Sequence, residues 1–377
     1  MKILLLIHEF PPIGGGGGKI ALDTARELVR RGHRVHAITP SFRGLPLRSN
    51  VDGIRITRLP SFRRQLYAAD LLAMSSYLAV GFLTGLWSIW HEHPDLIHVH
   101  FAVPAGALAW SLSKVTGVPY VLTTHLGDVP GGVPEKTDRW FQWVYPFTPR
   151  IWRDAAQVTA VSESTRQLAL KRYPRAIQVI PNGISLEDIP VQNVWSHCPP
   201  QIAFAGRLVP QKNPIEVVRI LSRLKDLEWA CTIMGDGPLE GAMRAEIRAH
   251  GLERRITMTG WLETGEVSSR LAQSDILFMP SLSEGLPMAA LQAVGVGLAL
   301  VVSRVGGLAE IVKDGTNGFL LEPGDSQGFE ACLRRLLSTP EMLRAMRQAS
   351  LIKSREFDIG RVADEYIRVF EQTISRK

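Results

Sequence analysis

The stretch that decides the fold reads Asp275-Ile-Leu-Phe-Met-Pro-Ser-Leu-Ser-Glu284-Gly-Leu-Pro-Met-Ala-Ala-Leu-Gln292-Ala. An apolar strand leads through an acidic turn into a helix. Because a helix start carries partial positive charge and unpaired backbone N–H groups, this turn is suited to hold a phosphate. Glu284 beside it can accept hydrogen bonds from hydroxyls, and Gln292 lies about two turns further along a similar face. Phosphate and hydroxyl recognition together indicate a nucleotide-sugar ligand.

Short apolar strands alternate with helical patterns on both sides of this stretch. In the first half the predicted strands are residues 3–7, 35–39, 96–100, 121–124, 157–161 and 178–180. In the second half they are residues 201–205, 229–234, 256–259, 276–279, 299–303 and 318–321. A first helix is expected over Ala21–Arg31, where Gly32 ends it. This alternation predicts parallel sheets built from strand–helix–strand units.

A proline-containing loop divides the pattern into two α/β domains. The chain of 377 residues is long enough for two cores. We predict one domain over residues 1–190 and a second over 191–360, with a hinge near 185–200. The amphipathic segment 361–377 is expected to dock back onto the first domain. Ligands of open α/β sheets bind outside the carboxyl ends of the strands, so two such domains would face each other across a cleft.

The composition is that of a globular protein, with 45% hydrophobic and 21% charged residues. Cys198, Cys231 and Cys332 are widely spaced, which argues against a disulfide framework or a zinc site and favours a reducing compartment. The apolar run from Ile3 to Ile7 is too short for a secretion signal and is better explained as a buried strand. We therefore expect a cytoplasmic protein.

Positive charge is concentrated in the first half. Residues 1–190 hold 21 Lys and Arg against 14 Asp and Glu, whereas residues 191–377 hold 22 of each, which accounts for the net charge of +7. The excess is densest among the arginines of residues 43–64. This segment is either a solvated Arg-rich loop or a surface for an anionic partner, such as a membrane leaflet, a lipid phosphate or nucleic acid.

Residues 71–90 contain no charged side chain and are long enough to cross a bilayer. Serines, threonines, glycines and aromatic residues dilute their hydrophobicity, so we interpret them as a buried or membrane-grazing helix. Together with the aromatic and basic stretch 139–153, they suggest peripheral contact with an anionic membrane at its cytoplasmic face. Alternatively, these tryptophans pack in the core or stack on a sugar.

A run of glycines follows the first predicted strand, in Pro11-Pro-Ile-Gly14-Gly15-Gly16-Gly17-Gly18-Lys19. Glycines let the backbone approach an anion closely, and a helix start follows. The run matches neither the dinucleotide fingerprint nor the Walker pattern, in which Ser or Thr would stand in place of Ile20. A dinucleotide-dependent enzyme is therefore a poor alternative, and the run is either a phosphate-binding or a mobile loop.

Two cations and two further glycine motifs follow predicted strands of the second half. Arg207 and Lys212, in Gly206-Arg-Leu-Val-Pro-Gln-Lys212, can neutralise a diphosphate or can be ordinary surface charges at a helix start. Gly235-Asp-Gly237-Pro is explained by a turn. Gly306-Gly307 offers another close approach of the backbone to phosphate.

Three histidines fall at strand ends of the first half. His98 and His100 alternate along one strand and share a face, so a metal pair is conceivable, but no third ligand is obvious. His125, in Thr123-Thr-His-Leu-Gly-Asp128, is the best candidate to contact a reacting sugar. A structural histidine is an equally good explanation for each of the three.

Taken together, these motifs resemble glycosyltransferase family 4, the retaining glycosyltransferases of the GT-B fold. The resemblance spans residues 2 to about 325 and includes Glu310 after Gly306-Gly307. It implies an N-terminal acceptor domain and a C-terminal donor domain, both Rossmann-like and doubly wound. It also implies a UDP- or GDP-sugar as co-substrate, with no metal and no cofactor.

The resemblance also assigns roles to individual residues. Arg207 and Lys212 would hold the diphosphate, and Glu284 the hydroxyls of the donor sugar. His125 would lie near the sugar C6 hydroxyl. The remaining donor-binding residues are expected to be Gly15, Gly16, Gly17, Gly18, Gly235, Gly237, Gly285, Leu286, Pro287 and Gln292. With no obvious carboxylate nucleophile, retention suggests that the departing diphosphate helps to deprotonate the acceptor hydroxyl.

One residue departs from the family pattern. The motif Glu-x7-Glu is here Glu284-x7-Gln292. The second carboxylate would accept from both ribose hydroxyls, whereas an amide has one acceptor oxygen. The expected function is sugar transfer to a saccharide or lipid-linked saccharide in bacterial polysaccharide or glycolipid synthesis, without a nucleic-acid partner. The alternative is a catalytically weakened relative that binds nucleotide-sugar.

Overall fold

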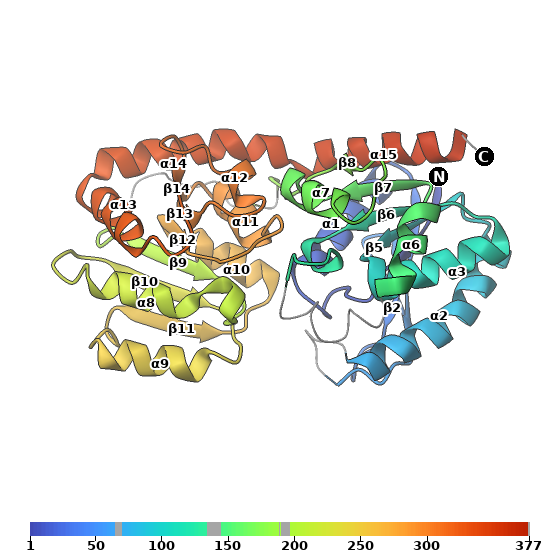
Figure 1. The fold of residues 1–377 in the computed structure, drawn as a ribbon, viewed down its shortest axis with the longest axis horizontal. Helices are drawn as coiled ribbons and strands as arrows, with labels where there is room; N and C mark the ends of the chain where they lie inside the picture. The colour runs from blue at the N-terminus through green and yellow to red at the C-terminus, as the bar shows by residue number, and fades with distance from the viewer. Residues whose placement is uncertain (65–69, 134–144, 188, 190–196, 376–377) are drawn as a thin grey trace. The chain divides into compact units, whose positions relative to one another are not determined.

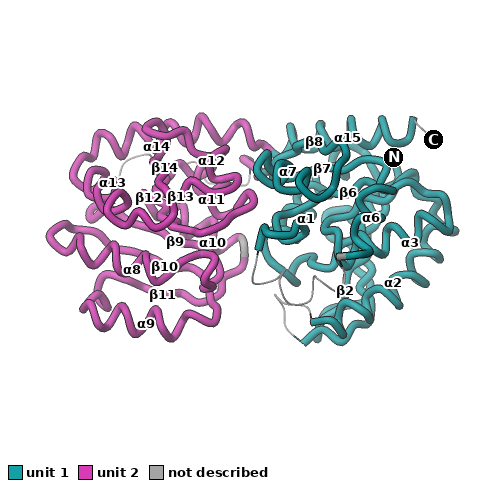
Figure 2. The backbone as a smooth tube through the Cα atoms, in the orientation of Figure 1, with its two compact units in different colours: residues 1–183, 359–377 teal, residues 184–358 magenta. Residues whose placement is uncertain are grey.

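The computed structural model describes residues 1–64, 70–133, 145–187, 189 and 197–375. The chain divides into two compact units (Figure 2). Unit 1 comprises Met1–Gly183 and Ile359–Lys377, and unit 2 comprises Ile184–Asp358. The chain passes from unit 1 to unit 2 after Gly183 and back after Asp358. The predicted domain ends, residues 190 and 360, lie close to these two points.

Unit 1 is built on an eight-stranded sheet with the order β3-β4-β2-β1-β5-β6-β7-β8 (Figure 1). Neighbouring strands are parallel except for β3 and β4. The strands are β1 (Lys2–Leu6), β2 (Arg34–Pro40), β3 (Arg48–Val51), β4 (Ile54–Leu59), β5 (Leu96–His100), β6 (Tyr120–Thr124), β7 (Gln157–Ala160) and β8 (Gln178–Val179).

Helices cover both faces of this sheet. They are α1 (Gly16–Arg30), α2 (Leu71–Glu92), α3 (Ala107–Thr116), α6 (Thr148–Asp154), α7 (Glu163–Leu170) and α15 (Ile359–Ser375), with short turns η1 (Ala102–Gly106), η2 (Leu126–Asp128) and η3 (Tyr145–Phe147). Alternate residues of β1 belong to two separate apolar clusters: Ile3 and Leu5 pack with α1 and α15, whereas Leu4 and Leu6 pack with α2 and α3. The last helix therefore completes unit 1.

The Arg-rich segment of unit 1 contains a β-hairpin that the sequence analysis missed. Asp52 and Gly53, both with positive φ (52° and 81°), form the two-residue turn between β3 and β4. An Asp-Gly pair is the preferred sequence for such a turn, because the right-handed twist of the strands requires positive φ at both residues. Residues 43–64 are thus not a single loop: β4 pairs in parallel with β2 inside the sheet.

Unit 2 has a six-stranded, fully parallel sheet with the order β11-β10-β9-β12-β13-β14. The strands are β9 (Gln201–Ala205), β10 (Ala230–Met234), β11 (Ile256–Gly260), β12 (Ile276–Met279), β13 (Ala299–Ser303) and β14 (Gly318–Leu321). The helical elements are η4 (Pro210–Lys212), α8 (Pro214–Ser222), α9 (Glu240–Ala249), α10 (Thr264–Leu271), α11 (Met288–Gly295), α12 (Leu308–Ile311), α13 (Ser326–Ser338), α14 (Pro340–Ser354) and η5 (Arg355–Phe357). Two doubly wound parallel α/β domains are confirmed.

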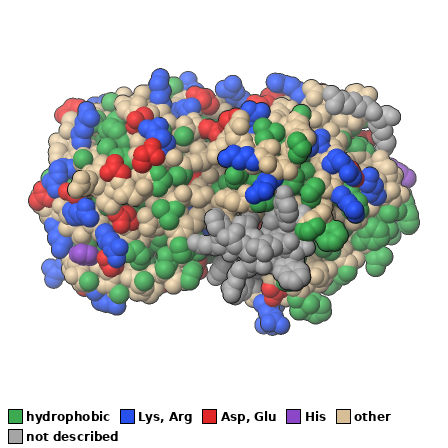
Figure 3. All heavy atoms as spheres, in the orientation of Figure 1, with side chains coloured by type: hydrophobic (Ala, Val, Ile, Leu, Met, Phe, Trp, Pro, Cys, Tyr) green, Lys and Arg blue, Asp and Glu red, His purple; other side chains and the backbone are tan. Residues whose placement is uncertain are grey.

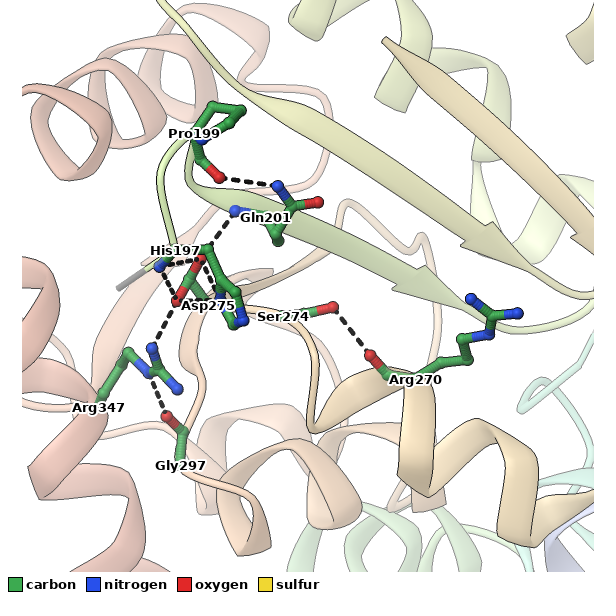
Figure 4. A network of polar contacts seen from close by, with 8 residues as sticks. All are labelled: His197, Pro199, Gln201, Arg270, Ser274, Asp275, Gly297 and Arg347. Carbon is green, nitrogen blue, oxygen red and sulfur yellow. Dashed lines mark hydrogen bonds and ion pairs between the residues drawn. The ribbon is translucent and has the colours of Figure 1, made fainter. Parts of the chain in front are cut away.

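A buried ion pair fixes the amino end of β12 in unit 2 (Figure 4). Asp275 and Arg347 are both fully buried and bonded to each other. The Asp275 carboxylate also accepts from the backbone N–H groups of His197 (3.2 Å) and Gln201 (2.7 Å), and Arg347 donates to the Gly297 carbonyl at 2.9 Å. One carboxylate therefore ties together the segment before β9, the start of β12 and helix α14.

Helix α2 has one buried and one exposed face. By length and composition alone it could cross a membrane, and a third (33%) of its most apolar window is buried. Gly81 and Gly85 pack closely against Leu108 and Leu112 of α3, where a Cβ would approach to 2.8 and 2.6 Å. The opposite face exposes apolar side chains, which gather at the lower right of Figure 3, over α2: Leu72, Leu83, Trp87 and Trp90.

The aromatic and basic stretch 139–153 is only partly described. Residues 139–144 lie outside the described residues. Trp152 of α6 is buried in the core of unit 1, where its ring stacks on Tyr173 with centroids 4.1 Å apart. The suggestion that the tryptophans of this stretch contact a membrane is therefore wrong for Trp152, whose role is packing.

Candidate functional site

The order of the strands decides where functional side chains can gather. In unit 2, β9 is flanked by β10 and β12, so the chain reverses its winding direction beside β9. In unit 1 the same reversal falls between β1 and β5. Ligands of open α/β sheets bind at such points, outside the carboxyl ends of the strands. The predicted site residues follow these strand ends.

In unit 2, Lys212 and Glu284 form a buried ion pair. The Lys212 Nζ atom lies 2.6 Å from both carboxylate oxygens of Glu284. Only 14% of the lysine side chain and 4% of the glutamate side chain are exposed. Lys212 ends η4 after β9 and Glu284 follows β12, so the pair joins the two strands on either side of the reversal. Both residues stand in motifs that the sequence reveals, whereas their contact depends on the fold.

Arg207 is the second cation at this strand end. It is half-buried directly after β9, and no ion pair is found for it among the residues that the structure describes. A guanidinium that has no carboxylate partner and follows the same strand as Lys212 can attract and orient a diphosphate.

The glycines around Arg207 bring two loops together. A Cβ on Gly235 would lie 2.0 Å from the Gly206 carbonyl oxygen, and one on Gly237 would lie 2.6 Å from that of Leu208. The Gly235 N–H already donates to the Gly260 carbonyl at 2.9 Å. These two predicted donor-binding glycines therefore let the loop after β10 pack against the loop that carries Arg207.

The loop that carries Glu284 leads into helix α11. A Cβ on Gly306 would lie 1.7 Å from the Glu284 carbonyl oxygen, and the Gly307 N–H donates to the Gly285 carbonyl at 2.5 Å. Gly306-Gly307 thus supports this loop instead of facing outward. Leu286 is buried, and Pro287 precedes α11 without any side-chain cap. No described side chain caps this helix start, so an anion could accept from its first two N–H groups, whereas the Ala290 N–H already donates to the Pro287 carbonyl at 3.1 Å.

Gln292 lies about one turn into α11. It is not two turns from Glu284 on a shared helical face, because residues 284–287 form the loop before the helix. Its side chain is buried, and its Nε2 atom donates to Ser268 Oγ of α10 at 2.9 Å. The amide is therefore held by the neighbouring helix.

In unit 1 the glycine run forms the start of α1. Gly15 precedes the helix and Gly16 begins it; both are exposed, and no side chain caps this end. Gly17 and Gly18 pack closely, since a Cβ would lie 2.5 Å from the Phe101 ring and 2.6 Å from the Glu9 carbonyl oxygen. Two of the four predicted glycines therefore face outward, and two allow close packing.

Phe101 and His125 form an aromatic stack beside Gly17. Their ring centroids are 4.3 Å apart, and the planes are inclined by 27°. Phe101 has a φ of 73°, which is unfavourable for a residue with a side chain and is typical of functional sites. No glycine or turn motif marks Phe101, so the sequence analysis missed it.

Hydrogen bonds define the tautomers of His125 and His100. The His125 imidazole accepts from the Asp128 backbone N–H, and the Asp128 carboxylate accepts from the His125 backbone N–H. Because His125 Nε2 faces His100 Nδ1 at 3.3 Å, the accepting nitrogen of His125 is Nδ1. His125 Nε2–H therefore donates to His100. The Nε2–H that remains on His100 is buried and has no partner among the described residues.

Burial keeps these imidazoles neutral. It lowers the pKa of His98 to about 3 and that of His125 to about 4, and it holds the pKa of His100 well below its usual range. His98 bonds Thr123 Oγ1 at 2.9 Å and packs against Tyr366 and Phe370 of α15. His98 therefore belongs to the core between β5 and α15, as the structural interpretation of the sequence allowed. Within the described residues, no group of three or more potential ligands could hold a metal ion.

Comparisons with known proteins identify the family of the chain. Residues 14–188 match the model for "Glycosyltransferase Family 4" and residues 186–351 that for "Glycosyl transferases group 1". A 2-deoxystreptamine glucosyltransferase of Streptomyces kanamyceticus is 27% identical, over 94% of this chain and 98% of its own. The 2-deoxystreptamine N-acetyl-D-glucosaminyltransferase of Streptomyces fradiae is 30% identical, over 84% and 81%.

One further relative acts on a lipid-linked acceptor. The UDP-Gal:alpha-D-GlcNAc-diphosphoundecaprenol alpha-1,3-galactosyltransferase of Escherichia coli is 27% identical, over 65% of this chain and 67% of its own.

Solved structures share the fold. Sucrose-phosphate synthase of Thermosynechococcus elongatus superposes with a TM-score of 0.87, at 18% identity over 100% of both chains. HepE of Anabaena, in complex with UDP and glucose, superposes with a TM-score of 0.78, at 19% identity over 99% of this chain and 100% of its own. The two units have the architecture of GT-B glycosyltransferases. The chain belongs to glycosyltransferase family 4 and is a glycosyltransferase.

Proposed function

We propose that this glycosyltransferase is a retaining hexosyltransferase that uses a UDP- or GDP-sugar. The observation that carries the proposal is the buried Lys212–Glu284 pair beside the unpaired Arg207, at the carboxyl ends of β9 and β12. The diphosphate would bind Arg207 and the start of α11 and would draw Lys212 away from Glu284. The released carboxylate would then accept hydrogen bonds from the sugar hydroxyls.

The proposed reaction needs no protein nucleophile. The bond between sugar C1 and the diphosphate oxygen breaks while the acceptor oxygen bonds to C1 from the same face. The departing diphosphate takes the acceptor hydroxyl proton, and Arg207 and Lys212 stabilise the negative charge that it develops. In unit 1, the His125 ring stacked on Phe101 would lie near a sugar hydroxyl and could bond it only in exchange for its bond to His100. Metal independence is part of the proposal, so transfer should persist in EDTA.

Turnover of a labelled donor tests the proposal. A thermal-shift panel of nucleotide-sugars would first identify the donor, and the Arg207→Ala variant would then be compared with the parent protein. We expect kcat to fall by about 10²–10³-fold, because Arg207 would act on charge that develops in the transition state. A product of inverted configuration, or unchanged turnover in Arg207→Ala, would contradict the mechanism. A catalytically weakened relative, the alternative raised by Gln292, would bind donor without consuming it.

We further propose a saccharide or lipid-linked acceptor, in bacterial polysaccharide or glycolipid synthesis at the inner face of the cytoplasmic membrane. The exposed apolar face of α2, with Leu83 (70% exposed), Trp87 (50%) and Trp90 (62%), supports peripheral contact with an anionic leaflet. Sedimentation with liposomes tests this contact. Binding should increase with the fraction of anionic lipid and should decrease in Leu83→Ser/Trp87→Ser. Binding that is independent of lipid charge would contradict contact with an anionic leaflet.

A further inference from the structure

A basic cavity lies at the carboxyl edge of the unit 1 sheet, apart from the candidate functional site. It measures about 570 Å³ and is lined by the loop after β2 and the segment after β4. Ser61 Oγ donates to the Ser41 carbonyl at 3.0 Å, which joins the two segments across the cavity. Beside it, Arg58 is buried and donates to the Pro46 carbonyl at 3.1 Å. The cavity walls are therefore held by hydrogen bonds.

The lining is strongly positive. Arg43, Arg63 and Arg64 line the cavity, and none of the other described lining residues carries a carboxylate. Arg43 and Arg64 are exposed, and within the described part of the chain neither forms an ion pair. Arg63 is buried and donates to the His8 carbonyl at 3.0 Å. Arg43 and Arg64 therefore present two guanidinium groups to the cavity, which favours a ligand with more than one negative charge, such as a diphosphate.

The cavity has an apolar rim that leads to α2. Leu47 and Phe62 line it with 54% and 65% of their surfaces exposed. The Phe62 N–H donates to Ser76 Oγ of α2 at 3.3 Å, so this segment is attached to the helix. The exposed apolar face of α2 begins nearby at Leu71 and Leu72. Charge inside the cavity and hydrocarbon outside it match an anionic group on a lipid.

The distance to His125 suits an extended acceptor. Strands β2, β1, β5 and β6 are consecutive neighbours, and β4 lies beyond β2. With neighbouring strands about 4.8 Å apart, the cavity is about 14–19 Å from the end of β6, where His125 lies. A saccharide could cover this distance along the sheet edge within unit 1.

We propose that this cavity binds the diphosphate of a lipid-linked saccharide acceptor. The lipid would leave over Phe62 toward α2, and the saccharide would extend along the strand ends toward His125. This assignment rests on the proposed function, because it names the acceptor class of the same enzyme. It also predicts a binding site that can be measured without any sugar transfer.

Farnesyl diphosphate is a suitable probe for calorimetry with the full chain. We expect Arg43→Ala/Arg64→Ala to weaken its binding by about tenfold or more, because two charge-assisted contacts are lost. Arg43→Lys/Arg64→Lys should retain part of the affinity. Arg34→Ala is the matched control: Arg34 is an exposed arginine at the amino end of β2, the opposite edge of the same sheet, and its removal should change nothing.

Three results would overturn the proposal. Unchanged farnesyl diphosphate binding in Arg43→Ala/Arg64→Ala would exclude the cavity as the site. Inorganic pyrophosphate that binds as tightly as farnesyl diphosphate would show a site for free phosphate instead of a lipid. If Arg43→Ala/Arg64→Ala lost adsorption to phosphatidylcholine–phosphatidylglycerol vesicles but kept its affinity for farnesyl diphosphate, the two arginines would serve general membrane contact instead of diphosphate binding. Failure of the proposed function would appear separately, as absence of nucleotide-sugar binding by the parent protein.

Discussion

Units 1 and 2 share the winding of their sheets but differ in the chemistry at the carboxyl edge. In unit 1 the strand ends beside the reversal carry neutral, buried imidazoles and the Phe101 ring. In unit 2 the equivalent edge carries the Lys212–Glu284 pair, Arg207 and an uncapped helix start. Topology therefore determines where a ligand can bind, and the side chains determine what it is.

The difference separates two kinds of recognition. Neutral imidazoles in a dry environment can exchange hydrogen bonds with hydroxyls but offer little to a phosphate. A buried ion pair next to a free guanidinium can reorganise around added negative charge. The basic cavity beside β2 and β4 is the exception in unit 1, because it offers arginines to a charged group. Each unit thus has its own response to mutation and to pH.

The strongest test removes the charge pair of unit 2. Lys212→Ala should lower kcat by about 10²-fold or more, because a cation that stabilises the leaving group is lost. It should also destabilise unit 2 by about 3–5 kcal/mol, because Glu284 is left buried without a partner. Turnover assays and chemical denaturation measure the two effects.

A double variant separates these effects. Lys212→Met/Glu284→Leu removes both charges and should recover most of the lost stability while turnover stays low. Wild-type turnover in either variant would exclude a catalytic role for Lys212. Unchanged stability of Lys212→Ala would show that the ion pair with Glu284 contributes little to the stability of unit 2.

The second test is directed at unit 2 alone. Arg347→Met leaves the fully buried Asp275 without its guanidinium and should cost about 3–5 kcal/mol. Hydrogen exchange should show faster opening of β9 and β12, with unit 1 unaffected. Arg334→Met, which removes an exposed pair with Asp226, is the matched control and should have no measurable effect. Equal protection in Arg347→Met and Arg334→Met would contradict the network in Figure 4.

The third test is pH, which should act mainly on unit 1. Burial lowers the pKa of His36 and His98 to about 3 and that of His125 to about 4, whereas an unfolded histidine titrates at about 6.5. Between these values the unfolded chain binds more protons. The contribution to stability is therefore fully present above about pH 6.5 and is lost as the pH falls toward 4.

Hydrogen exchange at about pH 7 and pH 5, corrected for intrinsic rates, checks this prediction. Protection of β5 and β6 should decrease at the lower pH more than that of β9 and β12, since neither His197 nor His250 of unit 2 is buried. His98→Gln should reduce the difference. Equal losses in both units would contradict the assignment of the pH response to the buried imidazoles.

The smallest expected effect concerns donor affinity in unit 2. Gln292→Glu restores the carboxylate of the family motif and should tighten nucleotide binding by about 1–2 kcal/mol, because a charge-assisted hydrogen bond to ribose is added. Calorimetry with UDP and GDP measures this change. Ser268→Ala, which removes the partner of the Gln292 amide, controls for reorientation of the side chain. Unchanged or weaker binding in Gln292→Glu would show that residue 292 does not contact the nucleotide.

The fold could be predicted from sequence largely because buried parallel strands are continuous apolar runs. All strands of unit 2 were found in this way. The hairpin β3–β4 is difficult to recognise because arginines alternate with apolar residues in β4. These charges suggest a loop, although Asp52-Gly53 is a turn signal. Helix α1 begins at Gly16, before the predicted Ala21. The low helix propensity of glycine argues against a helix there, but close packing against Glu9 and Phe101 requires glycine at positions 17 and 18.

Site residues with a motif were found, and residues without one were not. Lys212, Glu284 and His125 each stand in a recognisable pattern, yet their contacts depend on loop geometry that spacing does not encode. Phe101 has a positive φ and packs against Gly17 and His125, and no local sequence pattern indicates either feature. The hydrogen bond between His100 and His125 joins two strands that are separated by a helix, so local sequence could not reveal it.

The return of α15 to unit 1 affects how the protein can be made. A ribosome releases the last helix only after all of unit 2 has been synthesised, so the face of the unit 1 sheet at His98, where Tyr366 and Phe370 pack, stays uncovered until then. The nascent chain would need a chaperone, or would remain partly molten on that face, during translation of the entire second unit. Premature termination before residue 359 would give a protein with a complete unit 2 and an unfinished unit 1.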